Sequence, residues 1–215
     1  GPIRPACSAR IRHTGIDVAP EAAVRPYDAS APGGVLGEGG GIVILEAPES
    51  ARARGARVYV EIAGFGAGQS PSRAADPERH AIGLTYAIQN ALHDAGIEPD
   101  DIGAILPGAF GAPDADREEA TALRAVFGER LAEIPMITIT PNIGNTLAGN
   151  GGLAACVAAM SVHRQTLPAR IHAGTPDPGL CAGASALRDA ELRHVLVCTT
   201  ALAGQNAALI LRRPD

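Results

Sequence analysis

The chain has 215 residues, of which 46% are hydrophobic, 19% charged and only 3% aromatic, and its formal net charge is -5. This composition predicts a globular domain with one sizeable core, and it argues against nucleic acid as a partner, because a clustered basic surface and aromatic stacking platforms are both lacking. Since no apolar run approaches the roughly 20 residues of a bilayer crossing and no basic and apolar leader opens the chain, we expect a cytoplasmic protein that does not span a membrane.

The residue types that commonly hold metals or cofactors are scattered. The four cysteines, Cys7, Cys156, Cys181 and Cys198, are widely spaced and form no Cys-x-x-Cys motif, so neither a disulfide framework nor a metal site is expected. The glycine run at residues 37–41 precedes a strand pattern and is not followed by Gly-Lys-Ser/Thr, so no nucleotide or other cofactor is indicated. The six histidines are also dispersed, and none is expected to act as a catalytic base.

The first forty residues show no regular pattern, and we expect an irregular leader over residues 1–40 and one domain over residues 41–215. The apolar run from Gly41 to Leu45 predicts a short buried strand. Pro48 to Arg54 predicts a short helix that stops at Gly55, a residue suited to the left-handed conformation after a helix. The alternation from Val58 to Ala63 predicts a second strand.

The clearest helix has Asp76 as its N-cap and Pro77 at its first helical position, and it ends at Gly96. Its periodicity predicts a core face made of Ile82, Tyr86, Ala87 or Ile88, Ala91 and Ala95.

The rest of the chain continues this alternation of strands and helices. We expect strands at residues 102–106, 136–139, 195–200 and 207–211, and helices at residues 116–127 and from the Gly-rich loop to about residue 165. The strands are continuous apolar runs, which is typical of strands buried on both faces. The sequence therefore predicts an α/β fold.

Five segments resemble, in order and spacing, the signatures of the beta-ketoacyl-ACP synthases. They are residues 25–46, with RPYDA and GVLGEGGGIVILE; residues 51–59, with ARARGARVY; residues 111–128, opening with GAPDADREEA; residues 142–152, with NIGNTLAGNGG; and residues 202–207, with LAGQNA. Each segment is a weak signal alone. Because all five occur in the same order and spacing, the chain is identified as a member of the ketosynthase branch of the thiolase superfamily.

The resemblance implies the C-terminal half of a thiolase-like fold, layered α/β/α/β/α. In the family, the catalytic cysteine lies upstream of the signature that begins here at Arg25, and Cys7 is too close to that signature to be its counterpart. We therefore expect the chain to cover roughly the C-terminal half of a ketosynthase-like protein, with the N-terminal half missing.

The family's chemical positions are altered in this sequence. Members of the family use two histidines and a lysine beside the cysteine, and these positions correspond here to Gly108, Asn145 and Thr140. None of the three residues is a base near neutral pH, so the resemblance implies that no catalytic position is intact. The turn that gates the substrate tunnel in the family corresponds to Thr200, Leu202, Gly204 and Asn206.

Three functions fit this pattern. The preferred hypothesis is a non-catalytic subunit, or part of one, resembling the chain-length factors of type II polyketide assembly, which supports a partner ketosynthase in a heterodimer. The second is a divergent acyltransferase that uses Asn145 and a cysteine from the missing half. The third is a structural interaction module. The implied partners are a ketosynthase subunit, the complementary N-terminal half, or both, together with an acyl carrier protein.

An isolated half of a layered fold is also expected to expose an apolar face. Proteins normally cover such a face with another part of the chain or with a partner. The sequence therefore predicts association.

Overall fold

The computed structural model describes residues 18–71, 77–201 and 203–215. The helices are α1 (Pro20–Ala23), α2 (Pro48–Ala53), α3 (Pro77–Ala95), α4 (Pro113–Phe127), α5 (Thr140–Ile143) and α6 (Asn150–Arg164), with 3-10 turns at Pro99–Asp101, Gly128–Ala132 and Leu147–Gly149. The strands are β1 (Glu61–Gln69), β2 (Ile102–Leu106), β3 (Thr166–Leu167), β4 (Arg188–Asp189), β5 (His194–Thr200) and β6 (Gln205–Arg212).

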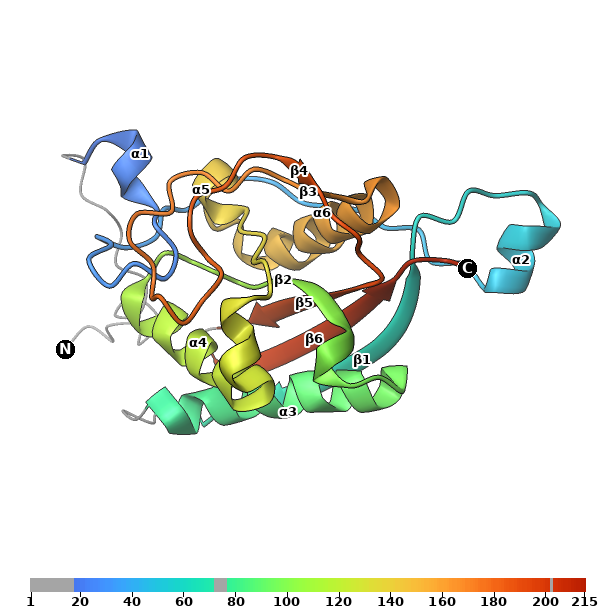
Figure 1. Cartoon of the computed structure of the whole chain (residues 1–215), viewed down its shortest axis with the longest axis horizontal. Helices are drawn as coiled ribbons and strands as arrows, with labels where there is room; N and C mark the ends of the chain where they lie inside the picture. Colours follow the sequence, from blue (N-terminus) through green and yellow to red (C-terminus); the bar gives the residue numbers. More distant parts are fainter. Residues whose placement is uncertain (1–17, 72–76, 202) are drawn as a thin grey trace, which may run out of the picture.

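Four strands form the main sheet in the order β1-β6-β5-β2. The strand β6 runs antiparallel to β1 and β5, and β2 runs parallel to β5. Figure 1 shows this sheet between α3 on one side and α6 on the other. The described part of the chain is thus a three-layer α/β/α arrangement, and the α/β fold class that the alternating sequence pattern predicts is confirmed.

Each face of the sheet has its own apolar core. On one face, Leu84 and Ile88 of α3 and Leu123 of α4 pack against inward-facing residues of β2, β5 and β6. On the other face, Ala158 and Val162 of α6 pack against the alternate residues of the same strands. The central strands are buried on both faces, which explains their continuous apolar sequences.

The strand β1 brings α3 unusually close through three alternate glycines, Gly64, Gly66 and Gly68. A Cβ atom on Gly66 would lie 2.0 Å from the Ala87 carbonyl oxygen of α3, far inside van der Waals contact. Gly64 and Gly68 meet backbone carbonyl oxygens of α3 in the same way. The glycines are therefore required by the packing of helix on strand rather than by turn geometry.

The predicted strand at Gly41 to Leu45 is wrong. These residues form no strand in the described chain, and Ile42 and Ile44 are 93% and 88% exposed. A strand needs a hydrogen-bonded neighbour, and no described segment pairs with this one. Its apolar sequence therefore indicates a surface that this chain does not cover by itself.

Two other strand predictions are only partly confirmed. The strand predicted at Val58 to Ala63 begins at Glu61 and extends to Gln69, where β6 provides its partner. At residues 136–139 only Met136 makes a bridge, parallel to Ile105 of β2. The predicted strand at these residues is thus reduced to a single bridged residue, Met136, beside β2.

The helix α3 is confirmed, but its predicted core face is partly wrong. It begins at Pro77, and Gly96 after it has a positive φ of 64°; Asp76 lies outside the described residues. Ile82 and Tyr86 are 44% and 58% exposed, whereas Ala81, Leu84, Ala87, Ile88 and Ala91 are buried. The buried face is displaced because α3 packs on β1 and α4 at once, which a single amphipathic period does not reveal.

The remaining elements agree with the sequence to within a few residues. The helix α4 begins at Pro113, three residues before the predicted start, and Gly128 ends it with a φ of 55°. The helices α2 and α6 and the strands β2, β5 and β6 lie where they are expected. Within the described ranges, no helix is long and apolar enough to cross a membrane.

The glycine stripe of β1 gives a direct test of this packing. We expect Gly66→Ala to lower the free energy of unfolding by about 1–3 kcal/mol, because the added methyl group forces the helix and strand apart. Gly40→Ala is the matched control, since a Cβ there would meet nothing within 4 Å. Urea unfolding followed by circular dichroism measures both, and equal midpoints for the two variants would contradict the explanation.

Candidate functional site at the loop after strand β2

A cavity of about 790 Å³ lies where the loop after β2, the start of α6 and the β5–β6 turn meet. Five residues singled out from the sequence line this cavity: Gly108, Asn145, Thr200, Gly204 and Asn206. Segments far apart in the chain, from Gly34 to Ala207, are thus brought to one site. Leu202 lies outside the described residues.

Thr140 does not line the cavity. Its side chain is buried, with 1% of the residue exposed, and its hydroxyl donates to the Ala109 carbonyl oxygen. Ala109 has a positive φ of 45°, a conformation that costs energy for a residue with a side chain. Thr140 therefore supports the backbone behind the cavity wall.

At Gly108 there is little room for a side chain. A Cβ atom there would lie 3.3 Å from Cζ of the Phe110 ring and 3.2 Å from Oε1 of Glu119. Phe110 also lines the cavity, so an aromatic ring forms the wall beside the residue that lacks a side chain. Phe110 could not be identified from the sequence, because nothing in the local pattern shows where its ring points.

Glu119 of α4 is the second residue that the sequence analysis missed. Its carboxylate accepts hydrogen bonds from the backbone N–H groups of Gly108 at 2.7 Å and Ala109 at 2.9 Å, and from the Tyr27 hydroxyl at 2.8 Å. Burial raises the pKa of Glu119, and the three hydrogen bonds oppose that rise. Its available signals were its place in the family-like segment GAPDADREEA and its position on the core-facing stripe of α4 with Leu123 and Phe127.

Asp116 lies one turn before Glu119 on the same buried face of α4. One of its carboxylate oxygens accepts the backbone N–H of Tyr27 at 2.9 Å. Burial raises the pKa of Asp116 to about 8, the Tyr27 hydrogen bond opposes this, and the nearby Glu119 charge adds to it. Two carboxyl groups therefore anchor the Tyr27 segment to α4.

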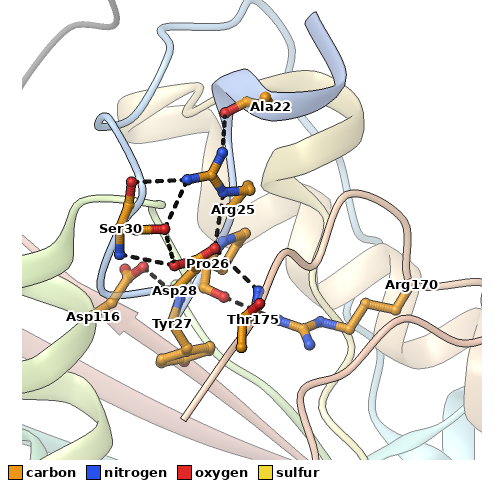
Figure 2. A network of polar contacts seen from close by, with 9 residues as sticks. All are labelled: Ala22, Arg25, Pro26, Tyr27, Asp28, Ser30, Asp116, Arg170 and Thr175. Carbon is orange, nitrogen blue, oxygen red and sulfur yellow. Dashed lines mark hydrogen bonds and ion pairs between the residues drawn. The ribbon is translucent and has the colours of Figure 1, made fainter. Parts of the chain in front are cut away.

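Figure 2 shows how the segment around Tyr27 is held on its other side. Asp28 accepts hydrogen bonds from Arg25 at 2.9 Å, from the Ser30 hydroxyl at 2.6 Å and from the Thr175 backbone N–H at 3.0 Å. Partial burial disfavours the Asp28 charge, but these hydrogen bonds outweigh it and lower the pKa to about 2. The ionised Asp28 thus joins residues 25–30 to the loop before β4.

Arg170 lies on the same side of this segment and is buried. Its Nε donates to the Thr138 hydroxyl at 2.9 Å, and burial lowers its pKa to about 10, so it stays charged near neutral pH.

Among the described residues, no group of three or more His, Cys, Asp or Glu side chains is placed to hold a metal ion.

Asn145 is held by the chain around it. Its backbone N–H donates to Val35 at 2.7 Å, and its carbonyl accepts the Gly37 N–H at 2.9 Å. Its side-chain Oδ1 accepts the Leu147 N–H at 2.9 Å. These bonds fix both the loop and the orientation of the amide.

The glycine run at residues 37–41 lies against this loop and the start of α6. A Cβ on Gly41 would lie 2.4 Å from the Gly152 carbonyl oxygen, and one on Gly149 would lie 2.1 Å from the Gly39 carbonyl oxygen. The run therefore serves close backbone packing.

Asn206 stabilises the turn between β5 and β6 through its side-chain amide. Its Nδ2 donates to the Ser70 hydroxyl at 3.0 Å and to the Gly204 carbonyl at 2.8 Å. Gly204 has a positive φ of 86°, and a Cβ there would lie 2.4 Å from the Ser70 carbonyl oxygen. Thr200 lies opposite Asn206 in the β5–β6 ladder.

Comparison with known proteins identifies this arrangement. The family model of the beta-ketoacyl synthase, C-terminal domain, matches residues 59–174. The chain is 32% identical over 195 residues to the 3-oxoacyl-[acyl-carrier-protein] synthase 2 of Staphylococcus aureus (strain COL). The aligned segment covers 90% of this chain and 47% of that protein. The chain is 33% identical over 217 residues to a putative polyketide beta-ketoacyl synthase 1 of Streptomyces halstedii, with 100% of this chain and 51% of that protein covered.

The same relationship appears in three dimensions. A solved ishigamide ketosynthase/chain length factor has a TM-score of 0.82 and 28% identity, with 94% of this chain and 49% of that chain covered. The fold is thus that of the C-terminal half of a thiolase-like ketosynthase. The chain belongs to the beta-ketoacyl synthase family, and it spans about half the length of these relatives.

The buried Asp116 leads to a prediction about pH. Its carboxyl stays protonated in the folded chain up to about pH 8, whereas the unfolded chain ionises it near its ordinary pKa of 3.8. Between these values the unfolded state binds fewer protons, so this group makes the free energy of unfolding fall as pH rises. We expect Asp116→Asn to remove a slope of up to about 1.4 kcal/mol per pH unit over this range, since an amide oxygen still accepts the Tyr27 N–H.

Urea unfolding at several pH values between about 5 and 8 measures this slope. Asp114→Asn is the control, because that carboxylate is exposed on the same helix. Parallel stability curves for the wild type and Asp116→Asn would show that Asp116 does not titrate in this way.

Proposed function

We propose that this chain is part of a non-catalytic, chain-length-factor-like subunit that supports a partner ketosynthase in polyketide or fatty-acid chain elongation. The observation that carries the proposal is the chemistry of the three altered positions around an otherwise well-formed site. Gly108 has no side chain, Thr140 is turned away from the cavity, and Asn145 can donate a hydrogen bond but cannot accept a proton near neutral pH.

Other groups near the cavity do not replace the lost chemistry. Cys198 lines the cavity, but burial and then the Glu119 charge raise the pKa of its thiol well above its ordinary value, so little thiolate forms. Glu119 accepts three hydrogen bonds, which leaves it a structural acceptor rather than a mobile base. These contacts support a framework role for this site.

The exposed apolar surface supports association with a complementary part of the fold. Figure 1 shows α2 projecting from the body of the molecule. We call the segment that leads from the glycine run through α2 to β1, residues 42–60, the arm. The arm and the adjoining β1 expose Ile42, Ile44, Leu45, Tyr59, Ile62 and Phe65. Soluble proteins rarely leave so many large apolar side chains together in water. We infer that a ketosynthase-type N-terminal half covers them, on the same polypeptide or on another.

The names of the relatives suggest the remaining partners. One relative is a synthase that acts on acyl-carrier-protein substrates, and one solved structure pairs a ketosynthase with a chain length factor. We therefore propose an acyl carrier protein and a ketosynthase subunit as the partners of the assembled protein.

A divergent acyltransferase is the second candidate, and the persistence of the cavity favours it. A transfer without decarboxylation would need no base at Gly108 or Asn145, only a nucleophile from the complementary half. The two functions differ in whether an acyl group becomes attached to the subunit that contains this chain.

Radiolabelled acyl loading separates these functions. In a complex of this chain, its complementary half and a co-purifying ketosynthase, we expect label on the ketosynthase alone, and no label on any subunit once the nucleophilic cysteine of the ketosynthase is changed to alanine. The matched control leaves that cysteine in place. Label on the subunit that contains this chain would overturn the non-catalytic role, and an unchanged product length in its absence would overturn the supporting role.

The exposed arm gives a separate test of association. We expect Ile44→Glu to weaken binding of the complementary half at least about tenfold, because a charge would be buried in an apolar interface. Arg52→Glu introduces the same side chain at an exposed position of α2 and is the control. Size-exclusion chromatography with light scattering measures the complex, and equal binding by both variants would place the interface elsewhere.

A further inference from the structure

The strand β1 forms an open edge of the main sheet. In the described part of the chain, the order β1-β6-β5-β2 leaves β1 paired on one side, by β6, and Figure 1 shows it as the outer strand. The opposite edge is partly covered, because the backbone of Ile105 in β2 bonds to Pro135 and Ile137. An open edge presents N–H and C=O groups with which a strand of another molecule can pair.

One hydrogen-bond donor of this edge is already occupied. The backbone N–H of Phe65 donates to Oδ2 of Asp94 in α3 at 2.9 Å. Successive N–H groups of a strand point to opposite sides, so the donors of Ala67 and Gln69 point the same way as that of Phe65. Phe65 is the middle residue of the nine in β1, and the Asp94 carboxylate therefore lies at the centre of the edge.

The glycine stripe of β1 explains how so short a side chain reaches the strand backbone. A Cβ on Gly64 would lie 2.2 Å from the Ala91 carbonyl oxygen and 2.8 Å from the backbone N of Ala95, so the last turn of α3 lies directly on the strand. Asp94 belongs to this turn, and its carboxylate is thereby brought within hydrogen-bond distance of Phe65.

A β-bulge protects another part of the same edge. The register with β6 shifts between Ile62 and Gly64, so Ala63 has no partner in β6. Bulges bend a strand and disturb further pairing, and they are common at sheet edges. The bulge thus interrupts the first half of the edge, and Asp94 occupies the donor at its centre.

The sequence of β1 favours pairing with a second copy of itself. The segment EIAGFGAGQ has one charged residue, Glu61 at its start, and no proline. Strands rich in glycine specify their register weakly and are prone to alternate pairings with other chains. An incoming strand would have to bring a carbonyl oxygen to the Phe65 N–H, where the Asp94 carboxylate already lies and repels it.

We propose that Asp94 blocks the outer edge of β1: its carboxylate occupies the Phe65 N–H and prevents β1 from pairing with β1 of a second copy. The proposal is independent of the proposed function. It concerns the hydrogen-bonding edge of the strand, whereas the complementary half is inferred to cover exposed apolar side chains.

Removing the acceptor tests this role in the 215-residue chain. Sedimentation velocity should show Asp94→Ala self-associating at a concentration at least about tenfold lower than the wild type. Asp94→Asn keeps an oxygen that accepts the Phe65 N–H, so we expect it to stay within about threefold of the wild type. Asn90→Ala is the matched control, because Asn90 is exposed one turn earlier on α3.

Amide hydrogen exchange identifies the surface that pairs. In Asp94→Ala, the amides of Ala67 and Gln69 should become at least about tenfold more protected as the protein concentration rises, and the wild type should show no such change. The wild type also gives a measurement that needs no variant to fold. After correction for intrinsic rates, its Phe65 amide should exchange at least about tenfold more slowly than that of Ala67, since Asp94 accepts the Phe65 N–H.

Four results would each overturn the proposal. The first is a folded Asp94→Ala that associates no more than the wild type, and the second is association without protection of Ala67 and Gln69, which would place the contact on another surface such as the arm. The third is equal association of Asp94→Asn and Asp94→Ala, which would mean that the hydrogen bond does not block the edge. The fourth is equal exchange of the Phe65 and Ala67 amides in the wild type.

Discussion

The Glu119 carboxylate is the interaction on which the rest of the site depends. It accepts the N–H groups of Gly108 and Ala109 and the Tyr27 hydroxyl, so one side chain of α4 joins the loop after β2 to the segment before the glycine run. Without these bonds, buried backbone donors would have no partner, and Ala109 would have less to hold its left-handed conformation. The cavity wall is therefore built from a helix side chain that lies within a family-like segment but was not identified as a site residue from the sequence.

A chain of polar contacts extends from this carboxylate. Tyr27 bonds to Glu119 through its hydroxyl and to Asp116 through its backbone N–H. The next residue, Asp28, bonds to Thr175, which lies almost 150 positions later. A short segment thus connects α4 on one side of the site with the loop before β4 on the other, and these contacts hold the shape of the site.

The sequence allowed most elements to be predicted because their ends carry local signals. Pro77 and Gly96 bound α3, and Gly128 ends α4 through a conformation that glycine adopts easily. The strand predicted at Gly41 to Leu45 failed for the opposite reason: strand pairing depends on a neighbour, and the local apolar pattern does not show whether the neighbour is present.

Of the candidate site, only the residues that correspond to the family's chemical and gate positions could be identified from the sequence. The family motifs brought Gly108, Asn145 and Asn206 to attention, and the structure places all three on one cavity. Phe110 and Glu119 were missed because their roles depend on the direction of a ring and on donors from a different element. Thr140 was expected with the catalytic positions, but its hydroxyl turns to the backbone behind the wall.

The contact between Gly41 and Gly152 also constrains the order in which the chain folds. These glycines meet backbone to backbone although more than a hundred residues separate them in sequence. Such a contact forms only after the intervening chain has closed into a loop, which makes it slow and late. During synthesis, the apolar residues beside Gly41 leave the ribosome well before the helix that receives the glycine run. The glycine run therefore cannot dock before α6 is made, and Ile42 and Ile44 beside it stay exposed even then, so they need chaperone protection until another surface covers them.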